Sequence, residues 1–231
     1  MEQTKHNEEN TENPIRSGLV WDLPTRLFHW LLVIFVIISF VTGNIGGNTM
    51  QYHEWGGFAI LTLLLFRLVW GFVGSRQSRF VTFVYGPSAV IRYVATLRHR
   101  DSPRYLGHNP LGGWSIIALL FTLLVQAATG LFANDDILTE GPLFDWVNKA
   151  TSDWLTKVHK LNQQVIIALV CVHVAAVLFY FFYKHQNLIL PMITGVKPWH
   201  DAEAEAEPAG RTWLAVLIAG LAALAVYLLV R

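Results

Sequence analysis

Two histidines, His159 and His173, lie fourteen residues apart within one apolar stretch of the chain. Fourteen residues of α-helix fall about 40° short of four full turns and rise by about 21 Å, so both imidazoles should project from one helix face at two depths. Two further histidines, His29 and His53, lie near the start of the first two apolar stretches. Neutral imidazole is a nitrogen ligand for metals, and two axial imidazoles complete the coordination of a haem iron. Four histidines at two levels therefore predict two stacked haems, each held by one pair.

Five apolar stretches must position these side chains: 24–43, 53–73, 113–132, 160–183 and 212–230. Each is long enough to cross the ~30 Å hydrocarbon core of a bilayer. The chain is 53% hydrophobic and only 14% charged, against about 25% charged residues in soluble proteins. We therefore predict an all-α integral membrane protein, in which a four-helix transmembrane bundle holds two b haems and a fifth transmembrane helix follows.

Loop charges predict the orientation. The segment between the second and third spans carries six arginines against the single Asp101, whereas segment 133–158 has five acidic residues and two lysines. Because basic loops stay in the cytosol, the N-terminus and the arginine-rich loop should be cytosolic. His53 and His159 then share the outer level, and His29 and His173 share the level nearer the cytosol. We call these the outer and inner pairs.

Other function classes are disfavoured by composition. The sole cysteine, Cys171, excludes an internal disulfide, and the absence of a C-x-x-C-H motif excludes covalent c-type haem attachment. A net charge of +1 argues against nucleic acid as a partner, and the polar, acidic first eighteen residues do not read as a signal peptide. The remaining histidines are expected at the surface or among lipid headgroups: His6, His99, His108, His185 and His200.

Three residues near the ligands are candidate cofactor contacts. Arg67 lies fourteen residues after His53, at the inner level. There it would either pair with a haem propionate or extend to the headgroups. Arg26, one turn before the first histidine, has the same two alternatives, with the headgroup favoured. Gly43 stands on the ligand face at the outer level, where a missing side chain would admit the macrocycle, although glycine also serves close helix packing.

Gln126 and Thr129 could hydrogen-bond a neighbouring helix, a propionate or a quinone, and the first is favoured.

The loops divide the chain further. Residues 87–100 have a helical apolar stripe backed by arginines, which predicts an amphipathic helix on the cytosolic surface. Residues 142–158 predict a similar helix on the outside, and either helix could seal the bundle or dock a partner. We expect a cytosolic tail at 1–22, the di-haem core at 23–185, a cytosolic linker at 186–210 that is acidic from residue 200, and the fifth helix at 211–231 as a peripheral anchor.

Several motifs resemble one family over roughly residues 18–197. They are VWDLPTRLFHW at 20–30, YHEWGG at 52–57, FRLVWGFVG at 66–74, YLGHNPLGGW at 105–114, TGLF at 129–132, and VHK at 158–160 followed by His173. Together they resemble the bacterial cytochrome b561 and nickel–iron hydrogenase b-type cytochrome family. The resemblance implies haem ligation by His29, His53, His159 and His173. The fifth span and the acidic linker depart from that family's four-helix pattern.

The resemblance also implies a function. Such proteins lie in the bacterial inner membrane among its lipids, and they pass electrons between the quinone pool, ubiquinone or menaquinone, and a redox partner. That partner is a hydrogenase, a reductase or a c-type cytochrome. The family also contains stand-alone quinone-linked enzymes, one type of which oxidises superoxide, and this is the alternative reading. A pure membrane anchor is disfavoured because it does not need stacked ligand pairs.

Overall fold

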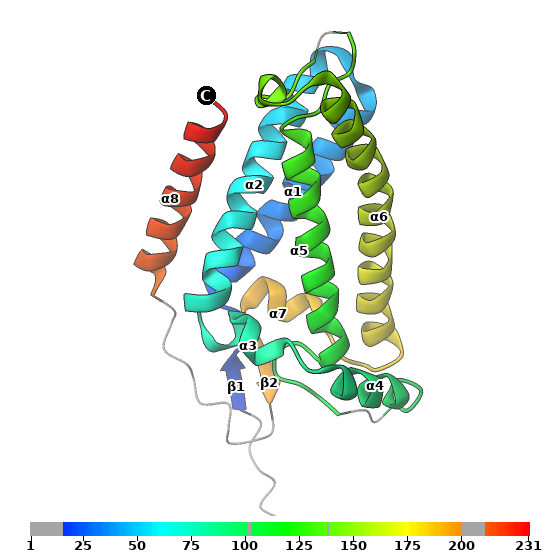
Figure 1. Cartoon of the computed structure of the whole chain (residues 1–231). Coiled ribbons are helices and arrows are strands. Elements are labelled where there is room, and N and C mark those ends of the chain that lie inside the picture. The colour runs from blue at the N-terminus through cyan, green and yellow to red at the C-terminus, as the bar shows by residue number, and fades with distance from the viewer. Residues whose placement is uncertain (1–15, 101–102, 138, 200–210) are drawn as a thin grey trace, which may run out of the picture.

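The computed structural model describes residues 16–100, 103–137, 139–199 and 211–231. Its long helices are α1 (Leu23–Ile45), α2 (Met50–Val73), α5 (Pro110–Gly130), α6 (Lys149–Phe182) and α8 (Thr212–Leu229). Within the described ranges, these five are long and apolar enough to cross a membrane, which confirms the five predicted spans and the all-α membrane fold class. Figure 1 shows them running alongside one another, with α8 at the edge of the group.

Side-chain caps fix where three of these helices begin. Asp22, Asn109 and Asn148 each accept a hydrogen bond from the backbone N–H three residues on, at 2.7, 2.7 and 2.9 Å respectively. Such caps satisfy an amide that the first helical turn leaves unpaired. A proline follows within two positions of the cap in α1 and α5, where its missing N–H costs nothing. The starts of α1, α5 and α6, and hence the depths of their side chains, are set locally by sequence.

α2 is the central helix of the bundle. It packs against α1, α5 and α8, while α6 packs against α5. Leu64 and Trp70 of α2 are each only 1% exposed. α8 covers the outer side of α2 with a stripe of buried residues spaced three or four apart: Ala215, Ile218, Ala222 and Val226. The fifth helix therefore lies outside the group formed by α1, α2, α5 and α6, as its plain apolar sequence predicts.

Short elements gather at one end of the bundle, which we call the α4 end. They are η2 (Arg76–Ser78), α3 (Phe80–Phe83), α4 (Pro87–Thr96), α7 (Ile189–Thr194) and the strands β1 (Arg16–Leu19) and β2 (Val196–Trp199). β1 and β2 pair antiparallel, with Arg16 opposite Trp199 and Leu19 opposite Val196. Figure 1 shows α4, α7 and the sheet together at this end. The helix predicted at 87–100 matches α4. The small sheet, which was not predicted, joins the N-terminal tail expected at 1–22 to the linker expected at 186–210.

The opposite end, which we call the η3 end, carries η1 (Gly47–Thr49) and η3 (Phe144–Trp146). A separate surface helix over 142–158 was predicted here, and that prediction is wrong. α6 starts at Lys149 and runs without a break for 34 residues, because the sequence has no glycine or proline between 149 and 182. At about 1.5 Å per residue it measures about 51 Å, so it extends well beyond a ~30 Å hydrocarbon core.

Candidate functional site

The outer pair comes together at the η3 end. His53 of α2 and His159 of α6 have ring centroids 6.1 Å apart with planes inclined at 76°. Nδ1 of His53 donates to the carbonyl of Ser39 on α1 at 2.8 Å. Nδ1 of His159 donates to the carbonyl of Gln126 on α5 at 2.9 Å. A carbonyl acceptor at Nδ1 fixes the tautomer in which Nε2 keeps its lone pair, which is the arrangement usual in metal-bound histidines.

The separation of the two rings suits one metal ion between them. Metal–imidazole bonds of about 2.0–2.1 Å on opposite sides of an ion, with the ring centre about 1 Å beyond each nitrogen, place the two ring centres about 6 Å apart. The 6.1 Å observed matches that value. His53 and His159 would therefore fit as the two protein ligands of one haem iron.

Two glycines make room for these hydrogen bonds. A Cβ at Gly43 would lie 2.6 Å from Nδ1 of His53, and one at Gly130 would lie 3.0 Å from Cε1 of His159. Each glycine is four residues after the carbonyl that its histidine uses. Because a helical Cβ leans toward the N-terminus and covers the turn before it, a side chain there would screen that carbonyl. Gly43 thus lies at the outer level as predicted, and what it accommodates is the His53 ring; its predicted contact with the macrocycle stays a prediction.

Polar residues of α5 bind α6 beside the outer pair. Asn162 donates to the side-chain oxygen of Gln126 at 2.8 Å, and the hydroxyl of Thr129 lies 3.2 Å from Nδ1 of His159. The favoured prediction for Gln126 and Thr129, a hydrogen bond to a neighbouring helix, is confirmed.

The inner pair lies nearer the α4 end. His29 of α1 and His173 of α6 are close enough to interact electrostatically, and both are half-buried. Nδ1 of His29 is buried without a hydrogen-bond partner among the described residues. Its ring packs edge-on against Trp30, with the ring centroids 5.0 Å apart. The structure thus brings His53 and His159 into contact and places His29 within electrostatic reach of His173, and ligation of iron by each pair stays a prediction.

Arg67 of α2 also lies at the α4 end, and its side chain does not extend to the surface. It is only 3% exposed, and its guanidinium carbon stands 4.8 Å from the ring centroid of Phe80. The headgroup alternative for this residue is therefore wrong. Arg26 is half-buried and donates to the carbonyl of Ile193 at 2.5 Å. This bond joins α1 to α7, and the predicted cofactor contact of Arg26 stays a prediction.

The surface position predicted for His108 is wrong. Its ring lies between Trp21 and Phe83, with centroid separations of 4.5 and 4.7 Å, and its Nδ1 is buried. Burial lowers the pKa of His108 to about 3, and the nearby groups Arg67, His173 and Lys197 add to that effect. The residue stands just before the Asn109 cap of α5, so the loop carries it under the bundle end. Because His108 lies outside every apolar span, helical periodicity does not predict its burial.

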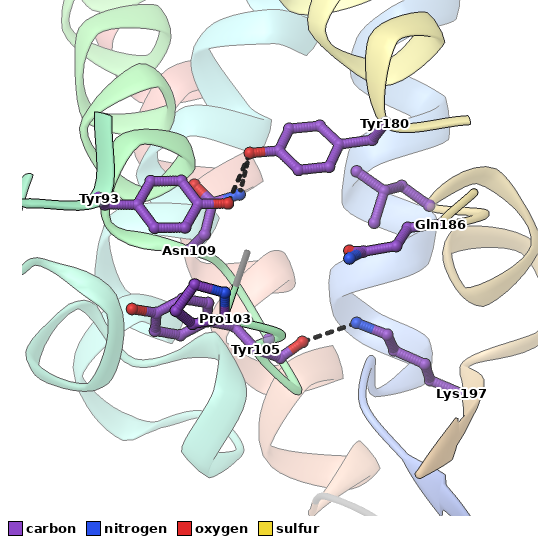
Figure 2. A pocket seen from close by; sticks show the side chains of 9 residues that line it. Tyr93, Pro103, Tyr105, Asn109, Tyr180, Gln186 and Lys197 are labelled. Carbon is purple, nitrogen blue, oxygen red and sulfur yellow. Dashed lines mark hydrogen bonds between the residues drawn. The ribbon is translucent and has the colours of Figure 1, made fainter. Parts of the chain in front are cut away.

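A polar pocket at the α4 end was not predicted from the sequence. It has a volume of about 20 Å³, enough for one ordered water. Figure 2 shows the hydroxyls of Tyr93 and Tyr180 meeting beside Asn109. The two hydroxyl oxygens are 2.7 Å apart, and Asn109 donates to Tyr180 at 3.0 Å. Lys197 of β2 donates to the carbonyl of Tyr105 at 2.6 Å. These residues come from four separate segments of the chain, so no local motif signals the pocket.

Comparison with known proteins agrees with this geometry. A family model described as prokaryotic cytochrome b561 matches residues 20–195. Similar proteins include the probable Ni/Fe-hydrogenase B-type cytochrome subunits of Rhizobium leguminosarum bv. viciae (27% identical, 81% of this chain, 92% of the relative) and Bradyrhizobium diazoefficiens (24%, 79%, 86%). The probable Ni/Fe-hydrogenase 1 B-type cytochrome subunit of Escherichia coli strain K12 is 25% identical over 78% of this chain and 91% of its own length. No solved structure matched the chain significantly. The paired histidines, the membrane-spanning bundle and the family match agree, and the chain belongs to the prokaryotic cytochrome b561 family.

Proposed function

We propose that the protein is a di-haem b-type cytochrome that carries electrons across the cytoplasmic membrane between the quinone pool and a redox partner. The single observation that carries this proposal is the outer pair. Two imidazoles from different helices have ring centroids 6.1 Å apart, and each Nδ1 is held by a backbone carbonyl. Such a pair is prepared to bind a metal through Nε2 on both sides.

Paired histidines suit electron transfer better than oxygen binding. When bound, haem iron supplies one-electron oxidation and reduction. The protein's contribution is that both histidines of a pair would ligate the iron, which would leave it no position open to a small molecule. His53 and His159 are held in orientation by their carbonyl partners, which keeps ligand movement small when the iron changes charge.

Haems at the two histidine levels would allow electrons to cross the bilayer. His159 and His173 lie fourteen residues apart on the unbroken helix α6, so their Cα atoms are separated by about 21 Å along the axis. Each contributes one ligand of a pair, and the second ligand comes from α2 at the η3 end and from α1 nearer the α4 end. In this proposal α6 sets the spacing of the two haems within the membrane.

The proposed partner is a hydrogenase, with quinone as the other redox partner. The relatives are named as hydrogenase B-type cytochrome subunits, and this chain covers 86–92% of the length of the three described above. The arginines that follow α2 and surround α4 favour a cytosolic position for the α4 end and the N-terminus. The outer haem would then face the periplasmic side, where a partner could reach it.

A redox titration of the purified protein beside single histidine variants tests the proposal. We expect two low-spin haems per chain. His53→Ala and His159→Ala should lose one transition, and His29→Ala and His173→Ala should lose the other. His99→Ala is the matched control, because that side chain is exposed outside the bundle, and it should keep both transitions. A colourless protein, one haem per chain, or loss of the same transition in His29→Ala and His159→Ala would contradict the proposal.

A further inference from the structure

Two buried nitrogens at the α4 end lack partners. Arg67 is 3% exposed, and neither its Nη1 nor Nδ1 of His108 has a hydrogen-bond partner in the part of the chain that the structure describes. A guanidinium keeps its charge even when buried. Removing that charge from water is strongly unfavourable unless an anion or several acceptors replace the water. The position of Arg67 therefore calls for an anion.

The carboxylate of Asp22 already accepts hydrogen bonds from groups other than Arg67. Asp22 lies within electrostatic reach of Arg67. Its carboxylate, however, accepts hydrogen bonds from the Thr25 amide at 2.7 Å, the Trp70 indole at 3.1 Å and the Ser78 hydroxyl at 3.2 Å. Burial raises the pKa of Asp22, but hydrogen bonds outweigh this effect and hold the pKa below its usual range. Asp22 therefore offsets part of the positive charge through space, while its oxygens serve other donors.

Arg67 and His108 lie in one aromatic enclosure. The ring of Phe83 stands 6.0 Å from the guanidinium carbon of Arg67 and 4.7 Å from the ring centroid of His108. Phe80 backs Arg67 from another side at 4.8 Å. His108 interacts electrostatically with both Arg67 and His173. The two residues thus share Phe83 as a neighbour, and His108 lies within electrostatic reach of both Arg67 and His173 of the inner pair.

We propose that Arg67 and His108 form a carboxylate-binding site that anchors a propionate of the haem held by His29 and His173. This inference rests on the proposed function. A guanidinium matches a carboxylate with parallel hydrogen bonds, and a neutral imidazole can donate a third from Nδ1. A lipid phosphate could offer similar chemistry, but the 3% exposure of Arg67 bars a headgroup from reaching it.

Substitutions at the two positions test the site in the full-length haem-loaded protein. Arg67→Gln removes the charge, and His108→Phe keeps a ring between Trp21 and Phe83 but removes the donor. Both should lower the midpoint potential of the inner haem, because an uncompensated carboxylate favours ferric iron, and neither should move that of the outer haem. Arg67→Lys should restore much of the inner potential. Arg92→Gln, on the exposed face of α4, is the matched control and should change neither.

Infrared difference spectra provide a second readout, which a purely structural role would not move. With ¹³C-labelled propionates, the redox-sensitive carboxylate band of the inner haem should shift in Arg67→Gln and in His108→Phe. Unchanged bands and unchanged potentials in both variants would overturn the carboxylate site. If Arg67→Gln holds no inner haem, the His108→Phe and Arg67→Lys spectra decide the question. A wild-type protein without two haems would instead contradict the proposed function, so the two failures are distinguishable.

Discussion

Replacing Gly43 by alanine should loosen the outer haem and leave the inner one in place. The new Cβ would lie 2.6 Å from Nδ1 and 2.9 Å from Cε1 of His53, whereas nonbonded carbon atoms prefer about 3.5–4.0 Å. The imidazole must therefore move away from the Ser39 carbonyl, and the 2.8 Å hydrogen bond that orients it is lost.

The size of the effect follows from that hydrogen bond. Loss of a partner that orients a metal-bound histidine weakens the metal site by roughly 10- to 100-fold, which is about 1.4–2.8 kcal/mol. The same substitution at Gly130 is milder. Its Cβ would lie 3.0 Å from Cε1 and 3.3 Å from Nδ1 of His159, so the ring needs to shift by only a few tenths of an ångström. We expect that variant near the lower bound, about 10-fold.

Haem transfer to excess apomyoglobin, followed by absorbance, measures the dissociation of each haem, and a potentiometric titration assigns the phases. Gly57→Ala is the matched control, because a Cβ there meets no described atom within 4 Å and the position is one turn after His53 on α2. Gly43→Ala should release the outer haem fastest, followed by Gly130→Ala, with Gly57→Ala at the wild-type rate. Release of both haems at wild-type rates from Gly43→Ala, or selective loss of the inner haem, would refute the reasoning.

Two other predictions concern Lys197 and α8. Burial, with a contribution from Arg104, lowers the pKa of Lys197 from 10.5 to about 8. Between these values the unfolded chain binds more protons than the folded one, so stability should rise with pH across that window. Thermal denaturation midpoints should show this rise in the wild type and a flatter profile in Lys197→Met, and a wild-type profile that falls would contradict it. A chain that ends at residue 210 should keep both haems, since α8 packs on the outer side of α2; a haem-to-protein ratio below two in that shortened chain would show that α8 supports the sites.

Helical periodicity explains how much of the site could be predicted. The interval of fourteen residues places side chains on one face in any straight helix, and α6 is one unbroken helix from Lys149 to Phe182. The levels of His29 and His53 follow from where their own helices begin. The contact between His53 and His159 could therefore be predicted in advance, because it depends only on regular geometry within the spans; the pairing of His29 with His173 rests on the same geometry and stays a prediction.

Helical periodicity does not predict the contacts that loops make. His108 belongs to no span, and its neighbours Trp21 and Phe83 come from segments far away in the sequence. The pairing of β1 with β2 joins residues near both ends of the family-matched region. The start of α6 was placed about eleven residues too late, because residues 142–158 were predicted to form a separate helix on the outer surface. In each case the path of a loop between two elements, and not a periodic pattern, decides where the residues lie.

The hydrogen bonds that orient the outer pair are hard to detect in the sequence. The acceptors for His53 and His159 are main-chain carbonyls, at Ser39 and Gln126, and every residue type has such a carbonyl. What distinguishes these two carbonyls is that the position four residues later is glycine in both cases, Gly43 and Gly130. A helical carbonyl has a second lone pair free after accepting its own helix bond, and the missing side chain leaves that lone pair open to a neighbouring helix. All four helices α1, α2, α5 and α6 therefore contribute to one site, although only two of them carry its histidines.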